Sequence, residues 1–272
     1  MLDFIKSELN KLNIDLVSCI SLNECKITRS YLLERNEIQD GSVIIFAVPY
    51  LTEISAGERN ISSYAVSRDY HLFFNNLFST LIPLLKDKYP NNKFVGFTDH
   101  SPIDEIHAGA IAGLGVIGKN HLLITEKYSS YIFIGEIITD ACLPSFAGNI
   151  HECINCKKCF EACPVNMKID ACLSALTQKK GELTIEEKKA IKSHGCAWGC
   201  DKCQMACPYT EKAIKSGTIY SKIPFFNDEL TPILDGETIE NMSKDDFSKR
   251  AYSWRGKSVI KRNLSILEGK EI

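Results

Sequence analysis

The stretch that decides the fold is CINCKKCFEACP, residues 153–164, and a second run, CAWGCDKCQMACP at residues 196–208, repeats most of it. In the first run, two, two and three residues separate successive cysteines, and Pro164 follows the last one. Bacterial ferredoxins hold [4Fe–4S] clusters with this spacing, and their fourth cysteine binds the other of two clusters. The second run repeats the two-then-three spacing and ends on Pro208. The sequence therefore predicts two [4Fe–4S] clusters.

An exchange of the fourth cysteines between the two runs assigns most of the cluster ligands. The predicted ligands of the first cluster are Cys153, Cys156, Cys159 and Cys207. Those of the second cluster are Cys163, Cys200 and Cys203, with one ligand still missing. In a plain ferredoxin the missing cysteine would stand at Ala197, so two candidates stay open, Cys196 and Cys172.

Structural zinc is the main alternative for these cysteines, because paired C-x-x-C runs also build zinc sites. Three cysteines at two-residue steps, with a fourth before a proline, are more typical of iron–sulfur proteins. We therefore favour clusters over zinc.

Length and composition are those of an ordinary globular protein. The 272 residues, 44% of them hydrophobic, are enough for one or two domains with a sizeable core. Twelve cysteines would suggest disulfides in a small secreted protein, but most of them here are predicted ligands. Residues 1–12 have an amphipathic helical pattern rather than that of a signal peptide, and no apolar run is long enough to span a bilayer. We expect a cytoplasmic protein without a membrane anchor.

The net charge of −2 gives no overall sign of nucleic-acid binding. From residue 241 onward, basic residues outnumber acidic ones. Such a run is most often a solvated helix face, which we take as its default interpretation.

Hydrophobic periodicity in the first half predicts helices mixed with buried strands, an α/β pattern. Helices are predicted at residues 1–12, 30–36 and 68–85, and strands at 14–20, 41–49, 93–98, 121–125 and 131–140. Farther along, residues 56–67 are predicted to be a loop, 211–240 a wrap-around segment and 245–267 a helix. The strand at 93–98 ends in a polar turn at Asp99, a place that commonly faces a ligand in α/β folds.

Three glycines, Gly113, Gly115 and Gly118, spell the dinucleotide fingerprint G-x-G-x-x-G. They follow a helix-like stretch rather than a strand, so the nicotinamide interpretation is weak. The alternative is a tight connection between a helix and a strand, in which glycine permits close backbone approach.

Several motifs outside the cysteine runs occur in a characteristic order. They are RDYH at 68–71, TDHSPIDE at 98–105, AGLGVIGKN at 112–120 and YIFIGEIITD at 131–140, with a fainter IKRNL at 260–264. In this order, and followed by both cysteine runs, they resemble epoxyqueuosine reductase, which uses cobalamin and two [4Fe–4S] clusters in the last step of queuosine synthesis in tRNA. The resemblance covers roughly residues 40–215.

The resemblance implies an α+β protein. We expect an N-terminal α/β cobalamin-binding domain of nitroreductase-like fold at residues 1–150, a two-[4Fe–4S] ferredoxin-like domain at 151–215, and a wrap-around segment with a basic helical tail at 216–272. The implied activity is an oxidoreductase that reduces epoxyqueuosine to queuosine, with electrons relayed through the clusters. The expected partners are the tRNA anticodon stem-loop and a low-potential electron donor, and we expect a monomer.

Site residues carry over by the same resemblance. Asp99 matches a proton donor above the corrin, and Cys172, in ACLSALT, matches a family cysteine that is the fourth ligand of the second cluster. This match favours Cys172 and leaves Cys196 as an extra thiol. The implied cobalamin contacts are Asp99, Leu123, Ile134, Ser174 and Asp201, and the implied tRNA contact is Lys180.

Two departures and two rival functions accompany this prediction. The interval from Cys163 to Cys172 is shorter than is usual in the family, and many members continue into helical repeats that help to grip tRNA. An unperturbed aspartate is ionised at neutral pH, so the acid role of Asp99 requires a raised pKa; the alternative is a cap of the turn before Pro102.

The rival functions are a corrinoid and iron–sulfur reductase of another substrate, and a non-enzymatic electron carrier.

Overall fold

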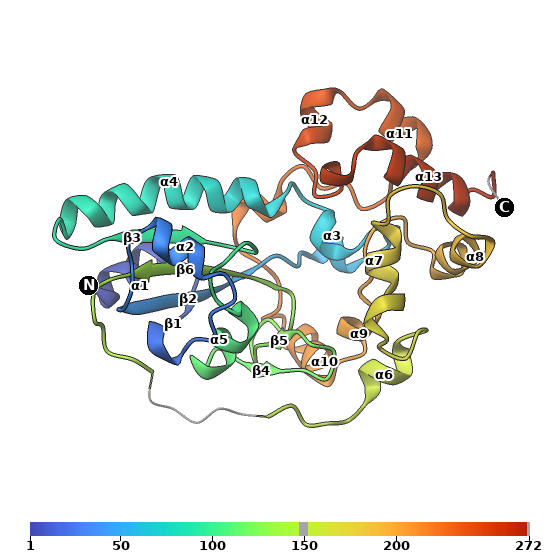
Figure 1. Cartoon of the computed structure of the whole chain (residues 1–272). Coiled ribbons are helices and arrows are strands. Elements are labelled where there is room, and N and C mark those ends of the chain that lie inside the picture. Colours follow the sequence, from blue (N-terminus) through green and yellow to red (C-terminus); the bar gives the residue numbers. More distant parts are fainter. Residues whose placement is uncertain (147–151, 271–272) are drawn as a thin grey trace. The chain divides into compact units, whose positions relative to one another are not determined.

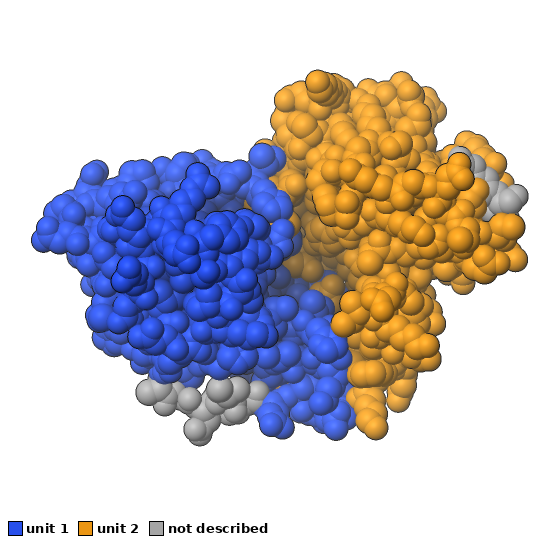
Figure 2. All heavy atoms as spheres, in the orientation of Figure 1, with its two compact units in different colours: residues 1–49, 71–156, 212–219 blue, residues 50–70, 157–211, 220–272 orange. Residues whose placement is uncertain are grey.

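The computed structural model describes residues 1–146 and 152–270, which group into two compact units (Figure 2). Unit 1 comprises residues 1–49, 71–156 and 212–219, and unit 2 comprises residues 50–70, 157–211 and 220–272. The predicted domains 1–150, 151–215 and 216–272 stay a prediction, and the boundary between the first two lies outside the described residues. The coarse prediction of a mixed α/β fold is confirmed.

Unit 1 is built on a four-stranded antiparallel sheet in the order β1-β2-β6-β3. Its strands are β1 (Leu16–Ser21), β2 (Ser42–Pro49), β6 (Ile132–Thr139) and β3 (Phe94–Phe97). β2 is buried along its whole length and rich in β-branched residues, as a central strand should be. In the central pair, Ile45 of β2 stands opposite Glu136 of β6.

Helices cover both faces of this sheet (Figure 1). Neighbouring residues of a strand point to opposite faces, so Ile45 and Phe46 serve different cores. Phe46 stacks on Phe74 of α4 (Tyr70–Lys88) with ring centroids 6.3 Å apart. Ile45 belongs to the other core, which it shares with α2 (Ser30–Arg35) and α5 (Glu105–Ile111). The remaining α-helices and strands with residues in unit 1 are α1 (Leu2–Lys11), the hairpin β4 (Val116–Ile117) and β5 (Leu123–Ile124), and the end of α10 (Pro208–Lys215).

The glycine-rich stretch makes the tight connection between α5 and the β4–β5 hairpin. Gly113 follows α5 with φ +75°, a backbone conformation that residues other than glycine rarely adopt. A Cβ at Gly115 would stand 2.3 Å from the carbonyl oxygen of Ile124. The glycines therefore fit a structural connection.

Unit 2 consists of short helices around an aromatic core. They are α3 (Glu53–Ala56), α6 (Lys158–Ala162), α7 (Leu173–Thr177), α8 (Ile185–His194), α9 (Lys202–Met205), α11 (Gly236–Asn241), α12 (Lys244–Ser248) and α13 (Lys257–Leu267). Trp198 and Tyr252 are fully buried in its main core, with ring centroids 6.3 Å apart. The indole N–H of Trp198 donates to the hydroxyl of Tyr64 at 2.7 Å.

The prediction of one helix over residues 245–267 is wrong. α12 ends at Ser248, a 3-10 turn spans Ser253–Arg255, and α13 starts at Lys257. Gly256 between them has φ +88°, which interrupts the helix. Tyr252, in the segment before Gly256, is fully buried in the core of unit 2. No helix among the described residues has both the length and the apolar character needed to cross a bilayer.

Candidate iron–sulfur site and acid loop

The later part of the first cysteine run, from residue 157, meets the second run inside unit 2. α6, which carries Cys159, packs against α9, which carries Cys203 (Figure 1). Cys163 directly follows α6, and Cys207 lies two residues beyond α9. Helix packing therefore brings together the parts of the chain whose fourth cysteines are predicted to be exchanged. Cys153 and Cys156 belong to unit 1.

Both candidates for the missing ligand lie close to Cys200. The pKa of the Cys200 thiol is raised mainly by burial, and further by the charges of Asp201 and Cys172. Burial likewise raises the pKa of Cys196 to about 12, and its thiol donates to the carbonyl oxygen of Trp198 at 3.3 Å. Cys196 thus has a hydrogen-bond partner in the chain already, and the choice of Cys172 stays a prediction.

The donor set fits iron–sulfur clusters. No disulfide joins the described cysteines, and of the eight predicted ligands Cys156 is exposed and the other seven are half-buried. No three Cys, His, Asp or Glu side chains within residues 1–146 and 152–270 are placed to hold a single ion.

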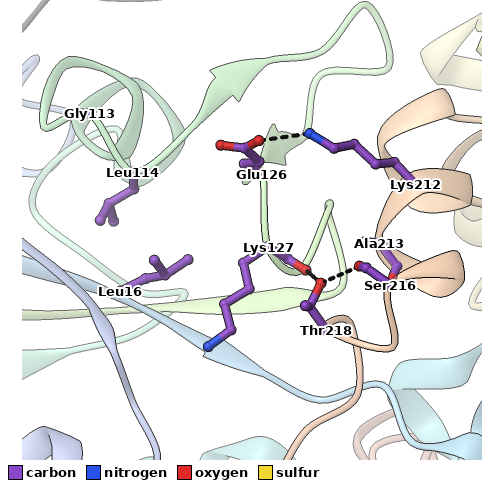
Figure 3. Close-up of a pocket in the computed structure, with 9 residues that line it drawn as sticks. All are labelled: Leu16, Gly113, Leu114, Glu126, Lys127, Lys212, Ala213, Ser216 and Thr218. Carbon is purple, nitrogen blue, oxygen red and sulfur yellow. Dashed lines mark hydrogen bonds and ion pairs between the residues drawn. The ribbon is translucent and has the colours of Figure 1, made fainter.

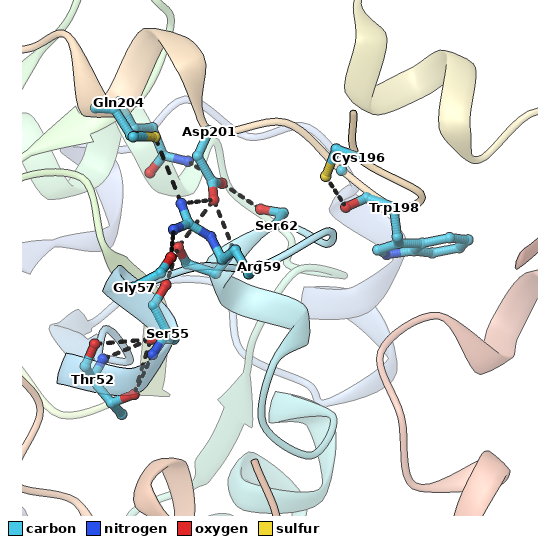
Figure 4. Close-up of polar contacts among 12 residues, drawn as sticks. Thr52, Ser55, Gly57, Arg59, Ser62, Cys196, Trp198, Asp201 and Gln204 are labelled. Carbon is cyan, nitrogen blue, oxygen red and sulfur yellow. Dashed lines mark hydrogen bonds and ion pairs between the residues drawn. The ribbon is translucent and has the colours of Figure 1, made fainter. Parts of the chain in front are cut away.

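Asp201, between two predicted ligands, is a buried anchor for the segment Arg59–Ser63 (Figure 4). Nη2 of Arg59 lies 2.9 Å from Oδ2 of Asp201, and the two side chains are 11% and 3% exposed. The backbone N–H and hydroxyl of Ser63 donate to the same oxygen at 2.7 and 3.0 Å, and the hydroxyl of Ser62 donates to Oδ1. Both carboxylate oxygens of this predicted cobalamin contact are therefore occupied by the chain itself.

The other predicted cofactor and tRNA contacts differ in how far they are exposed. Leu123 and Ile134 pack in the core beneath the sheet, and the Ile134 carbonyl accepts from Thr98 Oγ1 at 2.9 Å. Ser174 lies on α7, where its hydroxyl accepts from Gln178 Nε2 at 3.3 Å. Lys180 is exposed between α7 and α8.

Asp99 stands on a loop that the rest of unit 1 holds firmly. Its backbone has φ +60°, its side chain is 67% exposed, and His71 Nε2 lies 3.8 Å from its Oδ2. Downstream in the loop, Arg29 donates to the Ser101 carbonyl at 2.9 Å. The backbone N–H groups of Thr28 and Arg29 donate to the Pro102 carbonyl. An exposed carboxyl on a fixed loop can reach a bound molecule without rearrangement of its base.

Two glutamates beneath this loop were not among the predicted site residues. Glu136 of β6 is fully buried and accepts a hydrogen bond from the Ser101 hydroxyl, and burial raises its pKa to about 8. Glu105 starts α5, and burial followed by the charge of Asp99 raises its pKa to about 7. The backbone N–H of Asp99 also bonds to Glu105. For Glu136, the sequence signal was a carboxyl inside the apolar run YIFIGEIIT.

A separate cavity of about 470 Å³ lies in unit 1, between the β4–β5 region and the end of α10 (Figure 3). The Lys212 ammonium is 2.8 Å from Glu126 at its edge, and Thr218 Oγ1 donates to the Lys127 carbonyl at 3.1 Å. None of the predicted site residues lines it.

Comparison with known proteins connects the chain to one family. The family model described as Epoxyqueuosine reductase QueG, DUF1730, matches residues 38–100. The epoxyqueuosine reductase of Synechocystis sp. is 30% identical over 197 residues, which are 70% of this chain and 67% of that protein. That of Gloeobacter violaceus is 34% identical over 195 residues, 68% of this chain and 61% of that protein.

Solved structures agree with this fold. Epoxyqueuosine reductase from Streptococcus thermophilus matches with a TM-score of 0.80 at 23% identity, covering 98% of this chain and 80% of that one. A structure of epoxyqueuosine reductase with a tRNA-Tyr epoxyqueuosine-modified stem loop matches with a TM-score of 0.77 at 22% identity, covering 99% and 82%. The chain spans about three fifths of the length of the first curated relatives, 61% and 62%.

Proposed function

The chain belongs to the epoxyqueuosine reductase family, and we propose that it reduces epoxyqueuosine to queuosine in tRNA with two [4Fe–4S] clusters and cobalamin as cofactors. The observation that carries the proposal is the packing of α6 against α9, which brings the two cysteine runs of a family member together. Neither rival function is favoured by a specific contact among the described residues.

The eight predicted cysteines would hold the clusters, in the two sets given by exchange of the fourth ligands. When bound, the clusters and the corrinoid supply low-potential electrons, since [4Fe–4S] potentials reach several hundred millivolts below zero. Of these ligands, Cys159 lies on α6 and Cys203 on α9. The buried ion pair between Asp201 and Arg59 ties the second cysteine run to the segment Arg59–Ser63.

Removal of the epoxide oxygen to leave an alkene consumes two electrons and two protons and releases water. Negative charge grows on the oxygen as the C–O bond breaks, and a positioned acid is worth about two to four orders of magnitude in rate. We assign this role to Asp99, because its carboxyl is exposed on a loop whose base is fixed by Arg29 and Ser101. Asp99 and Glu105 repel each other when both are ionised, and this repulsion contributes to the raised pKa of Glu105.

The proposed substrate is the anticodon stem-loop of a tRNA, a molecule that this chain would meet in the cytoplasm. A lysine such as Lys180, exposed between α7 and α8, is suited to a phosphate contact. Its electron donor would be a low-potential protein or small molecule, and we propose that the chain works as a monomer.

The test is turnover by protein reconstituted anaerobically with iron, sulfide and cobalamin, given a chemical reductant and an epoxyqueuosine-containing stem-loop. Mass spectrometry of the released nucleosides should show loss of one oxygen atom. Asp99→Asn should keep iron and corrinoid while the rate falls by about two to four orders of magnitude. Full cofactor content without product would favour a reductase of another substrate, and clusters without corrinoid binding would leave the electron carrier.

A further inference from the structure

Three carboxyl groups of unit 1 follow one another from the surface inward. Asp99 is exposed on its loop, Glu105 lies behind it and binds its backbone N–H, and Glu136 is fully buried in β6. Asp99 and Glu105 interact electrostatically, as do Glu105 and Glu136. The line thus connects the proposed acid to the centre of the sheet.

The inner two carboxyls lack the partners that buried charges normally have. Glu136 accepts only from the Ser101 hydroxyl, and its Oε1 has no hydrogen-bond partner among the described residues. Oε2 of Glu105 is likewise buried and without a partner in the described part of the chain. A buried carboxylate with an unsatisfied oxygen is costly, so such a group retains its proton to a higher pH.

The groups facing this line come from several elements. Arg29, before α2, and Asp104, before α5, act on Glu105 with opposite signs. Asp104 itself is 3.3 Å from Lys26. Cys25 faces Glu136 as a thiol whose pKa burial raises to about 12, and His71 stands beside Asp99. The positive charge of Arg29 lowers the pKa of Glu105, and the Arg29 guanidinium also donates to the Ser101 carbonyl.

We propose that Glu105 and Glu136 are positioning residues for Asp99, which fix its loop from beneath and retain a shared proton next to it at neutral pH. Glu105 holds the loop through the backbone N–H of Asp99, and Glu136 holds it through Ser101. The inference rests on the proposed function only in taking Asp99 as the acid.

The physical consequence is a coupled titration. Like charges this close cannot all ionise at the pH of an isolated carboxyl, so the last protons leave the group as a set rather than from one residue. While one proton remains in the pair of Asp99 and Glu105, it is distributed over both carboxyls, and the state with the proton on Asp99 has the negative charge on Glu105. Asp99 would then carry a proton over a range of pH in which an isolated aspartate is already ionised.

The first experiment observes the carboxyls directly and needs no cofactor or turnover. In the full chain labelled with ¹³C at Asp and Glu carboxyl carbons, two glutamates should titrate above about pH 6, well above an ordinary glutamate. One of these signals should vanish in Glu105→Gln and the other in Glu136→Gln. In Asp99→Asn the Glu105 signal should titrate at lower pH, because a neighbouring charge is gone. Titration of every glutamate below about pH 5 would overturn the inference.

The second experiment measures the pH profile of turnover. The limb that falls as pH rises reports loss of the acid's proton, and Glu105→Gln should move it about one unit lower, a tenfold change in proton affinity. Glutamine still accepts from the Asp99 N–H, so the loop is kept while the charge is removed. The control Glu126→Gln alters an exposed pair in the same unit and should leave the profile in place.

The two experiments separate the failure of this inference from failure of the function. An unshifted limb in Glu105→Gln, with normal wild-type turnover, overturns the positioning role alone. A wild-type chain that reduces no epoxyqueuosine defeats the function, while the ¹³C titration still decides whether the carboxyls share a proton.

Discussion

At the scale of single residues, the sequence best predicts those functional residues that lie at fixed, short intervals along the chain. Cluster ligands follow from intervals of two and three residues, so eight cysteines could be proposed without a structure. Arg59 and Glu136 could not be found in this way, because their partners Asp201 and Ser101 are 142 and 35 residues away. Residues that are far apart in the sequence and meet only in the folded chain leave at most an indirect signal in the sequence, such as a charged residue within an apolar strand.

The choice between Cys172 and Cys196 is testable with one pair of variants. Cys172→Ala should lose about half of the iron and the electron paramagnetic resonance signal of one cluster, because four of eight ligands serve each cluster. Cys196→Ala is the matched control and should keep both, since its thiol donates to the Trp198 carbonyl. The reverse outcome would make Cys196 the ligand.

Glu136 should make the stability of the fold depend on pH. Burial raises its pKa from 4.5 to about 8, so the folded state binds this proton more tightly than the unfolded state does. The resulting stabilisation is complete below about pH 4.5 and is lost as pH rises toward 8. The free energy of unfolding in urea should therefore fall between about pH 5 and 8 by more than about 1.4 kcal/mol relative to Glu136→Gln.

The control for that measurement is Glu126→Gln, whose pH dependence over this window should follow the wild type, because the nearby Lys212 lowers the pKa of Glu126. A difference between wild type and Glu136→Gln that is the same at every pH would show that Glu136 is ionised in the folded chain.

At the scale of elements, periodicity finds helices and strands but not the breaks between them. The buried strands β2 and β6 were predicted because their apolar runs are long. The tail was predicted as one helix because its apolar pattern continues across Gly256, where the backbone instead turns with φ +88°. The loop at residues 56–67 gave no hint that it supplies Arg59 to the second cysteine run.

Replacement of Arg59 should loosen that run. Arg59→Met keeps most of the stem but leaves the buried Asp201 without its cation, and loss of one partner of a buried pair costs about 3–5 kcal/mol. We expect the lower end, because Ser62 and Ser63 still donate to Asp201. Urea unfolding and iron retention should both report the change. Lys261→Met, at an exposed pair with Glu240, should change neither, and equal effects of the two variants would contradict the anchoring role.

At the scale of the whole molecule, composition and motif order predicted the class of protein, and the comparisons with relatives support it. The sequence could not predict how segments are shared between the units. Residues 50–70 belong with the second cysteine run in unit 2, and residues 212–219 belong with the sheet of unit 1. Such interleaving depends on long-range contacts, which leave no periodic pattern.

Metal and corrinoid content of one anaerobic preparation tests the central claim most directly, namely that the two cysteine runs hold clusters serving a corrinoid. After reconstitution and incubation with cobalamin, the full chain should carry about eight irons, about eight sulfides and one corrinoid. Zinc at these cysteines in place of iron, or a chain with full clusters that retains no corrinoid, would contradict it.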